Sequence, residues 1–557
     1  MLHTRATWLG RTALIGLVGA LAASLAGCES ERDAAGGDRG ETEPFVFGVP
    51  TDARTLDPIF TTDGETFRVT RQIYDTLLDH EPGGKEIVGG LAEDWESSDD
   101  GLEWTFHLRE GVTFHDGEEL DGEAVCANFD RWHNFSGAYQ DTNFTYYWQN
   151  MFGGFAENEE GVETGEKYRS CSADGLTVTI EVAEPSANYP GAFSMATFGI
   201  VSPASLEEIS DDEITSADSP FPDYTQGPGV LAGTGPFAIG DWDHGAQELT
   251  LERFDDYWGE PAQVSTLIFK TISEETARRQ ALEAGDIDGY DLAAPGDVTP
   301  LEDNGFQVPT RDVFNILYLA FQQETTSEFA DIEVRQALAH AVDRQRIVDT
   351  ILPEGGEVAT QFMPPTVDGW SEDVTTYDYD PELAEQMLAD AGVDGLTVDF
   401  CYVTDTSRPY MPAVRDIFEI IEGDLESVGL SIDPVPMEWD QYIPATNSGQ
   451  CSLYLLGWTG DFNEGYNFLG TWFDRPSDEW GFHNEEIFDL LGEIDRTPDP
   501  DDRVGLLAEA NELIMDFLPG LPISSSPPSI AFAPDVEPMD VSPLTQERFE
   551  DVGFVEE

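Results

Sequence analysis

Two stretches in the first third of the chain alternate between apolar and polar residues. Residues 102–108 (LEWTFHL) follow the pair Asp100-Gly101, and residues 176–182 (LTVTIEV) follow Asp174-Gly175. A period of two after an Asp-Gly pair is typical of a half-buried strand that leaves a tight turn. Both stretches are therefore predicted to be β-strands.

Other stretches repeat their apolar residues every three or four positions, which predicts helices with one buried face. These stretches are residues 273–284, 332–352, 381–391, 411–428 and 503–517; in the second of them the apolar face is formed by Val334, Leu338, Ala341 and Val342. Alternation of strand-like and helix-like segments favours an α/β architecture. At 557 residues, the chain is long enough for more than one domain.

Charge is the extreme feature of the composition. The chain has 111 Asp and Glu against 26 Lys and Arg, a formal net charge of −85. Such a charge excludes general nucleic-acid binding, because phosphates would be repelled. Since the acids are spread over the whole chain, we interpret them as a surface adapted to concentrated salt; a localised acidic patch that binds cations is the alternative.

The N-terminus predicts export. Arg5 and Arg11 precede an apolar run over residues 12–25, and the run ends in the small residues that lead to Cys28. This order is that of a secretory signal peptide over residues 1–27. The stretch closing on Cys28 resembles a bacterial lipobox, which implies lipidation of Cys28 and an anchor on the outer face of the cell membrane. Polar residues 28–43 are predicted to be a flexible tether.

Four cysteines remain after Cys28. An even number in a protein exported to an oxidising compartment indicates two disulfides. Three pairings are possible, and neighbourhood in the sequence favours Cys126–Cys171 and Cys401–Cys451. The spacings do not form a CxxC zinc motif. No metal and no cofactor is predicted.

Six blocks, in order along the chain, resemble the family 5 extracellular solute-binding proteins of ABC importers, of the dipeptide- and oligopeptide-binding type. The blocks are residues 56–58 (LDP), 73–78 (IYDTLL), 90–95 (GLAEDW), 104–117 (WTFHLREGVTFHDG), 233–237 (GTGPF) and 334–344 (VRQALAHAVDR). The resemblance covers roughly residues 45 to 530. Each block alone is weak, whereas the ordered set is specific.

The resemblance implies a two-lobed α/β fold of the periplasmic-binding-protein type, with a hinge and an extra subdomain inserted in lobe one. Lobe one is expected over residues 44–78, 200–312 and 523–557, the inserted subdomain over 79–199, and lobe two over 313–522. A ligand would be trapped between the lobes as the hinge closes.

Two segments point to peptides among the ligands of this family. Residues 457–461 (GWTGD) are similar to a segment of dipeptide-binding members, in which the Asp takes the α-ammonium group of the ligand. Residues 408–412 (RPYMP) resemble the segment whose Arg takes the carboxylate. Carried over, Asp461 binds the N-terminus of the peptide and Arg408 its C-terminus, which suits a zwitterion. The same two segments place Trp458, Thr459, Gly460 and Tyr410 at the site.

Other function classes are weaker. The sequence contains no HExxH, GxSxG or Walker motif, so an enzyme is not expected. Another ligand of this family (a nickel complex, haem, an opine or an oligosaccharide) and a peptide-sensing receptor stay open as alternatives. The expected partners are a short peptide, the membrane permease of an ABC transporter and the membrane itself through the lipid anchor, with no nucleic acid; the protein is expected to be a monomer.

Overall fold

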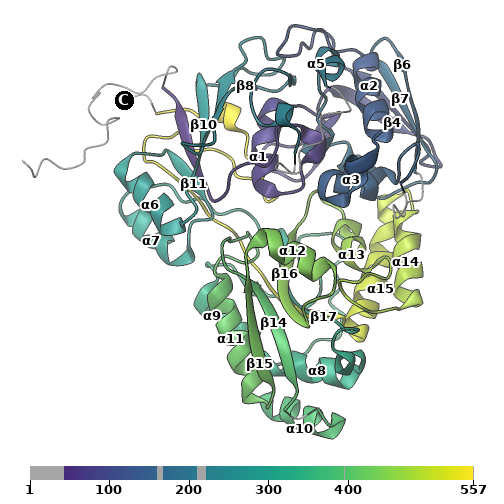
Figure 1. Ribbon diagram of the computed structural model, residues 1–557, viewed down its shortest axis with the longest axis vertical. Coiled ribbons are helices and arrows are strands. Elements are labelled where there is room, and N and C mark those ends of the chain that lie inside the picture. Colours follow the sequence, from purple (N-terminus) through teal and green to yellow (C-terminus); the bar gives the residue numbers. More distant parts are fainter. Residues whose placement is uncertain (1–42, 160–166, 210–220, 394, 556–557) are drawn as a thin grey trace, which may run out of the picture.

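The computed structural model describes residues 43–159, 167–209, 221–393 and 395–555. The predicted signal peptide and the lipidation site Cys28 lie outside the described residues. Strands of the described part form two six-stranded sheets, one four-stranded sheet and a two-stranded ribbon, and helices cover the sheets (Figure 1). This is a mixed α/β architecture, as the alternation of segments predicted.

The first sheet contains strands from both ends of the described chain. Its strand order is β18 (Ile530–Phe532), β11 (Gly289–Asp291), β1 (Phe45–Val49), β10 (Thr266–Thr271), β9 (Glu248–Arg253) and β8 (Phe237–Asp243). β1 is parallel to both of its neighbours and every one of its residues is buried, as expected of a central strand covered on both faces. Three helices accompany this sheet: α1 (Gly64–Ile73), α6 (Glu275–Ala284) and α7 (Pro295–Asp303).

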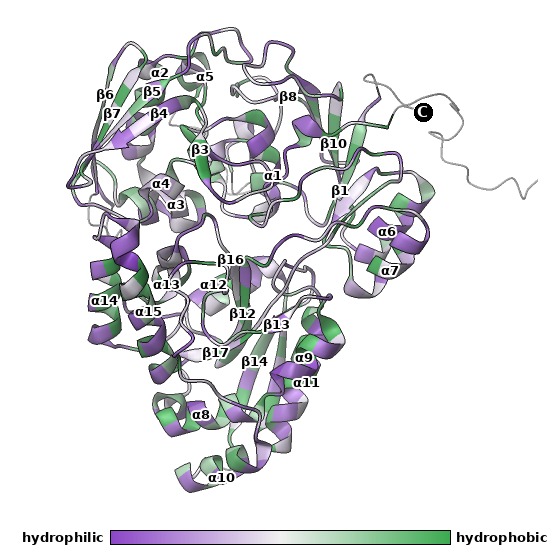
Figure 2. Cartoon of the chain, turned by 180° about the vertical axis from the view of Figure 1, so that it is seen from behind, coloured by the Kyte–Doolittle hydropathy of each residue, from purple (hydrophilic) through white to green (hydrophobic). Residues whose placement is uncertain are grey.

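The four-stranded sheet contains the two strands predicted from alternation. Its order is β4 (Ala92–Ser97), β5 (Glu103–Leu108), β7 (Thr177–Val182) and β6 (Tyr168–Asp174). β5 and β7 confirm the two predictions, and they are direct antiparallel neighbours. The disulfide Cys126–Cys171, present as predicted, joins β6 to α2 (Gly122–His133). Near this sheet lie α3 (Thr142–Phe152) and α5 (Pro203–Glu208), and α4 (Tyr189–Ala192) lies beside α3 in Figure 2. The ribbon of β2 (Leu78–His80) and β3 (Ile87–Gly89) contacts the sheet through β3 and β4.

The second six-stranded sheet lies in the other half of the molecule. Its order is β13 (Glu357–Val358), β17 (Gly520–Ser525), β12 (Asn315–Phe321), β16 (Leu453–Thr459), β14 (Thr397–Val403) and β15 (Ser431–Met437). The central strand β12 is buried throughout, and the second disulfide, Cys401–Cys451, links β14 to the residues just before β16. Figure 2 shows that strands of this sheet are mostly hydrophobic, whereas the surrounding helices carry both hydrophobic and hydrophilic residues.

One helix prediction is wrong. Residues 332–352 form two helices, α8 (Ile332–Ala341) and α9 (Arg344–Ile351), because Val342 between them has an extended backbone. The carboxylate of Asp343 accepts a hydrogen bond from the Arg346 amide at 3.0 Å and starts the second helix. The other four predicted helices are single helices: α6, α10 (Pro381–Ala391), α11 (Val414–Ser427) and α15 (Pro500–Phe517). Three further helices follow β15 and β16: α12 (Trp439–Asn447), α13 (Gly465–Phe473) and α14 (Glu485–Asp495).

Two segments that run side by side connect the two six-stranded sheets. Isolated bridges pair Gln307 with Phe532 and Thr310 with Ser529 in antiparallel fashion. The Asn315 side chain donates to the Ser526 carbonyl at 2.6 Å and accepts from the Ser526 amide at 3.1 Å. These paired crossings are the place where the predicted hinge would lie. The boundaries of the two lobes and of the inserted subdomain stay predictions.

A buried ion cluster lies beside these crossings. Arg311 donates to Asp291 at 2.6 Å and to Glu547 at 2.7 Å, and Arg68 of α1 pairs with the same two carboxylates and with Glu65. These side chains are almost fully buried. Because every charge in the cluster has at least one partner of opposite sign, the cluster avoids the cost of an uncompensated buried charge.

Candidate functional site

Asp461 lies directly beyond the end of β16. The strand ends at Thr459, and the Gly460 amide donates to the Phe314 carbonyl at 3.1 Å. A Cβ atom on Gly460 would lie 2.3 Å from the Phe314 ring, so only glycine permits this close approach. This close packing of Gly460 on Phe314 fixes the backbone position of Asp461.

The Asp461 carboxylate is held between two helices. Tyr147 of α3 donates its hydroxyl to one oxygen at 3.1 Å, and the Asn467 side chain of α13 donates to the other at 3.2 Å. Asn467 also accepts from the Asp461 amide at 2.9 Å and from the Trp458 indole at 3.1 Å. Asn467 therefore orients the carboxylate and the aromatic ring beside it.

The electrostatic state of Asp461 is unusual. Burial raises the pKa of its carboxyl to about 6, although the hydrogen bonds from Asn467 and Tyr147 and the charge of Arg71 act in the opposite direction. Within the described residues Asp461 forms no ion pair. A half-buried carboxylate without a bound cation is suited to receive one.

Arg408 lies in a tight turn after β14. Its backbone amide donates to the Met411 carbonyl at 3.2 Å, and the Met411 amide returns a bond of 2.8 Å. The guanidinium carbon lies 4.0 Å from the centre of the Trp439 ring, so it stacks on an aromatic face. Its Nε atom is buried without a hydrogen-bond partner among the described residues, and within the same part of the chain the guanidinium forms no ion pair.

Tyr410 connects Arg408 to the strand that leads to Asp461. A Cβ atom on Gly457 in β16 would lie 2.5 Å from the Tyr410 ring, so the ring packs directly on that glycine. Burial raises the pKa of Tyr410 to about 12, whereas the positive charge of Arg408 acts in the opposite direction. The structure thus brings both predicted segments, residues 408–412 and 457–461, to β16.

The remaining predicted site residues also lie at this place. The half-buried Trp458 ring packs 6.3 Å from Trp472, measured between ring centres. The Thr459 hydroxyl is buried and has no hydrogen-bond partner among the described residues. An unsatisfied buried hydroxyl next to Asp461 is an additional polar group available to a ligand.

The sequence did not indicate the residues that reach Asp461 from elsewhere in the fold. Tyr147 is 314 residues away in the sequence, and no local motif marks it. Arg71 of α1 is a second such residue: burial lowers the pKa of its guanidinium to about 10, while the negative charges of Glu547, Asp461 and Asp79 oppose that shift.

Several contacts join the part of the chain that carries α3 to the second six-stranded half. The Ser186 hydroxyl donates to Asp495 of α14 at 2.5 Å, and Lys167 pairs with the same carboxylate at 3.2 Å. Phe462, which follows Asp461, is buried in the hydrophobic core that the first sheet and the four-stranded sheet share. Asp461 therefore lies at the junction of the two halves.

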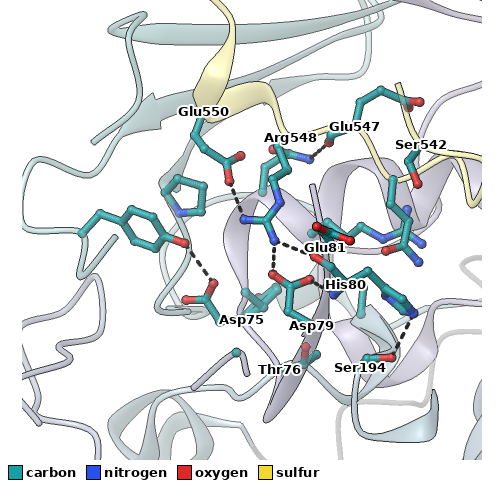
Figure 3. Close-up of a pocket in the computed structure, with 18 residues that line it drawn as sticks. Asp75, Thr76, Asp79, His80, Glu81, Ser194, Ser542, Glu547, Arg548 and Glu550 are labelled. Atoms are coloured by element: carbon teal, nitrogen blue, oxygen red, sulfur yellow. Dashed lines mark hydrogen bonds and ion pairs between the residues drawn. The ribbon is translucent and has the colours of Figure 1, made fainter. Parts of the chain in front are cut away.

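A separate polar cavity of about 60 Å³ lies beside α1 and the C-terminal segment (Figure 3). Arg548 forms ion pairs there with Asp79 and with Glu550, and Trp258 and Tyr257 donate to Asp75. Burial raises the pKa of Glu550 to about 7.

The described residues also give results on metals and membranes. Nowhere in residues 43–159, 167–209, 221–393 and 395–555 do three or more His, Cys, Asp or Glu side chains gather in a way that could hold a metal ion. The helices in these ranges include none with the length and apolar content that crossing a membrane requires.

Comparisons with known proteins agree on one family. The family model described as bacterial extracellular solute-binding proteins, family 5 Middle, matches residues 86–479. The dipeptide-binding protein of Escherichia coli is 29% identical over 514 residues, covering 90% of this chain and 92% of that protein. Heme-binding protein A of Haemophilus influenzae is 27% identical over 519 residues, covering 91% of each chain.

A solved structure shares the fold. It is the ABC transporter-associated periplasmic binding protein DppA from Helicobacter pylori in complex with the peptide STSA. It matches with a TM-score of 0.79 at 24% identity, covering 92% of this chain and 98% of that chain.

Proposed function

This chain belongs to the bacterial extracellular solute-binding proteins of family 5, and we propose that it captures short peptides, either dipeptides or oligopeptides. As a member of this family it is a solute-binding protein of an ABC importer and not an enzyme. Two relatives support peptides as the ligand class: one is named a dipeptide-binding protein, and the other was solved with a bound peptide.

The observation that carries the proposal is a pair of charged side chains, Asp461 just after β16 and Arg408 in the turn whose Tyr410 packs on β16. Asp461 is a half-buried carboxylate and Arg408 a half-buried guanidinium, and neither forms an ion pair with another residue in the described part of the chain. A zwitterionic peptide supplies the missing partner for both: its ammonium group binds Asp461 and its carboxylate binds Arg408. The guanidinium fork suits a carboxylate because it donates two parallel hydrogen bonds.

Closure of the hinge completes the site. In the proposed arrangement lobe two (residues 313–522) carries Asp461 and Arg408, while the inserted subdomain (residues 79–199) carries Tyr147. The hydrogen bond from Tyr147 to Asp461 spans these two parts. A peptide held at Asp461 thus adds contacts to both sides of the junction and favours the closed state.

The protein works outside the cell in this proposal. Cys28 carries a lipid and holds the mature protein at the outer face of the membrane, and the loaded protein delivers its peptide to the permease of the importer. The excess of 111 acidic over 26 basic residues keeps the surface hydrated in concentrated salt.

Calorimetric titration with a simple dipeptide in three forms tests the function. We expect the free dipeptide to bind, and we expect N-acetylation or C-amidation to weaken binding by about 30-fold or more, because each removes one charge. Haem is the second ligand to titrate, since one relative is named a heme-binding protein. Equal affinity for free and blocked peptides, or saturable binding of haem without binding of peptides, would contradict the proposal.

A further inference from the structure

A second half-buried carboxylate lies near the proposed peptide site. Glu479 belongs to the loop that follows α13, and its Oε1 atom accepts a hydrogen bond from the Tyr454 hydroxyl at 3.1 Å. Burial raises the pKa of the Glu479 carboxyl to about 7, against the lowering effect of that bond. Glu479 forms no ion pair with any other residue that the structure describes.

The tyrosine that donates to Glu479 belongs to a cluster of aromatic rings, and the negative charge of Glu479 adds to burial in raising the pKa of Tyr318 in that cluster. The Tyr318 ring lies 4.9 Å from Trp472, 5.2 Å from Trp480 and 6.5 Å from Tyr454, measured between ring centres. Tyr318 and Trp480 are both fully buried. The Tyr318 hydroxyl and the Trp480 indole nitrogen have no hydrogen-bond partner among the described residues. Buried polar atoms are normally satisfied, so these two mark a place built for a polar group.

The charges of Glu479 and Asp461 both act on α3. Tyr146 and Tyr147 are neighbouring rings with centres 5.0 Å apart, and Tyr147 donates to Asp461. Burial raises the pKa of Tyr146, and the negative charges of Asp461 and Glu479 both add to that shift. Arg475, in the same loop as Glu479, donates to Asn150 of α3 at 3.4 Å. The loop therefore lies against the helix that covers the Asp461 site.

We propose that Glu479 determines specificity by binding the cationic side chain of a lysine or arginine residue in the peptide. The inference rests on the proposed function: Asp461 takes the α-ammonium group, and Glu479 takes a second positive charge on the same ligand. A cation there gains a charge-assisted hydrogen bond to the carboxylate and the attraction of the nearby aromatic faces. A neutral side chain of equal length gains neither.

The test compares lysine with norleucine, which keeps the chain length and lacks the charge. The mature protein is titrated with Lys-Ala, Ala-Lys and their norleucine counterparts at pH about 8, where Glu479 is ionised, in about 1 M NaCl to screen the general negative charge. At one of the two positions the lysine peptide is expected to bind about 10- to 100-fold more tightly than its norleucine counterpart. Glu479→Gln removes this difference and leaves the norleucine affinities unchanged within about twofold.

Two further variants separate specificity from folding. Asp478→Asn removes the same charge from the exposed neighbouring side chain and is expected to keep the lysine preference. Tyr454→Phe removes the hydrogen bond but leaves the carboxylate, so the lysine preference persists and shifts to higher pH. At pH about 7 the lysine peptide should also release a proton from Glu479, seen as a dependence of the measured heat on the buffer.

The outcomes separate the role of Glu479 from the proposed peptide function. Equal binding of lysine and norleucine peptides, or a Glu479→Gln variant that weakens all peptides alike, overturns the inference and leaves the peptide function intact. Failure of every peptide, including the norleucine forms, overturns the proposed function and the role of Glu479 with it.

Discussion

We call the proposed pair of Asp461, which binds the ammonium end of the peptide, and Arg408, which binds the carboxylate end, the terminal clamp. It predicts that a variant of either residue damages recognition of one end only. Asp461→Asn keeps the size of the side chain and a carbonyl oxygen for Tyr147, but it removes the charge that faces the ammonium group. Arg408→Gln removes the charge that faces the carboxylate. Loss of one partner from a desolvated charge pair costs about 2–5 kcal/mol. Because both side chains are half-buried rather than fully buried, water screens them in part, and we expect the lower half of that range, about 30- to 300-fold in affinity.

The assay is calorimetry with free, N-acetylated and C-amidated forms of one dipeptide. Acetylation should weaken binding to the wild type strongly and to Asp461→Asn only slightly, and amidation should show the same pattern with Arg408→Gln. Asp433→Asn and Arg415→Gln remove the same charges from exposed side chains of the same half and are expected to bind like the wild type. If both variants lose affinity equally for all three peptides, the clamp reasoning is refuted, because a general loss of structure explains that pattern.

Four further predictions concern pH, stability, salt and location. Because the pKa of Asp461 is about 6 and the ammonium group binds the ionised carboxylate, peptide affinity should fall as the pH drops below about 6, approaching tenfold per pH unit, and an affinity unchanged between pH about 7.5 and 5 would contradict this. Arg311→Gln leaves Asp291 and Glu547 short of a buried partner, and denaturant titration should show a loss of about 3–5 kcal/mol in the free energy of unfolding; a loss below about 1 kcal/mol would refute the importance of the cluster. The midpoint of thermal unfolding should rise between dilute buffer and about 1 M salt as the net charge of −85 is screened, and a flat response would show that the acids are locally paired. Cys28→Ala should release the protein from membranes, and mass spectrometry that finds Cys28 without an acyl group in the native protein would contradict the anchor.

Secondary structure was predictable where local chemistry decides it. Strands β5 and β7 follow Asp-Gly turns and alternate strictly, so their positions are visible in the sequence. Residues 332–352 show the limit of this reasoning. The apolar period continues through Val342, but an Asp at the following position starts a new helix and its amide binds Asp424 of α11 at 3.0 Å. A partner 81 residues away overrides the local preference.

The roles of the candidate site residues stay predictions, and the sequence indicated only some of these residues. Asp461 and Arg408 were found through short motifs, and the structure brings both motifs to β16. Tyr147 was not predictable, because its role depends on how the part of the chain with α3 packs against the second sheet. Glu479 was hidden for another reason: in a chain with 111 acids, an acidic residue carries almost no information until its surroundings are known.

The scarcity of basic residues strengthens the assignment of Arg408. Carboxylates outnumber cations more than fourfold, 111 against 26, so acidic partners for an arginine are abundant. Buried arginines in the described part bind either carboxylates, as Arg311 and Arg503 do, or backbone carbonyls, as Arg335 and Arg344 do. Among the described residues, the Arg408 guanidinium binds neither a carboxylate nor a backbone carbonyl. Instead it stacks on the Trp439 ring, which holds it in place. A half-buried guanidinium that has no carboxylate or carbonyl partner among the described residues is available to an anion from outside the chain.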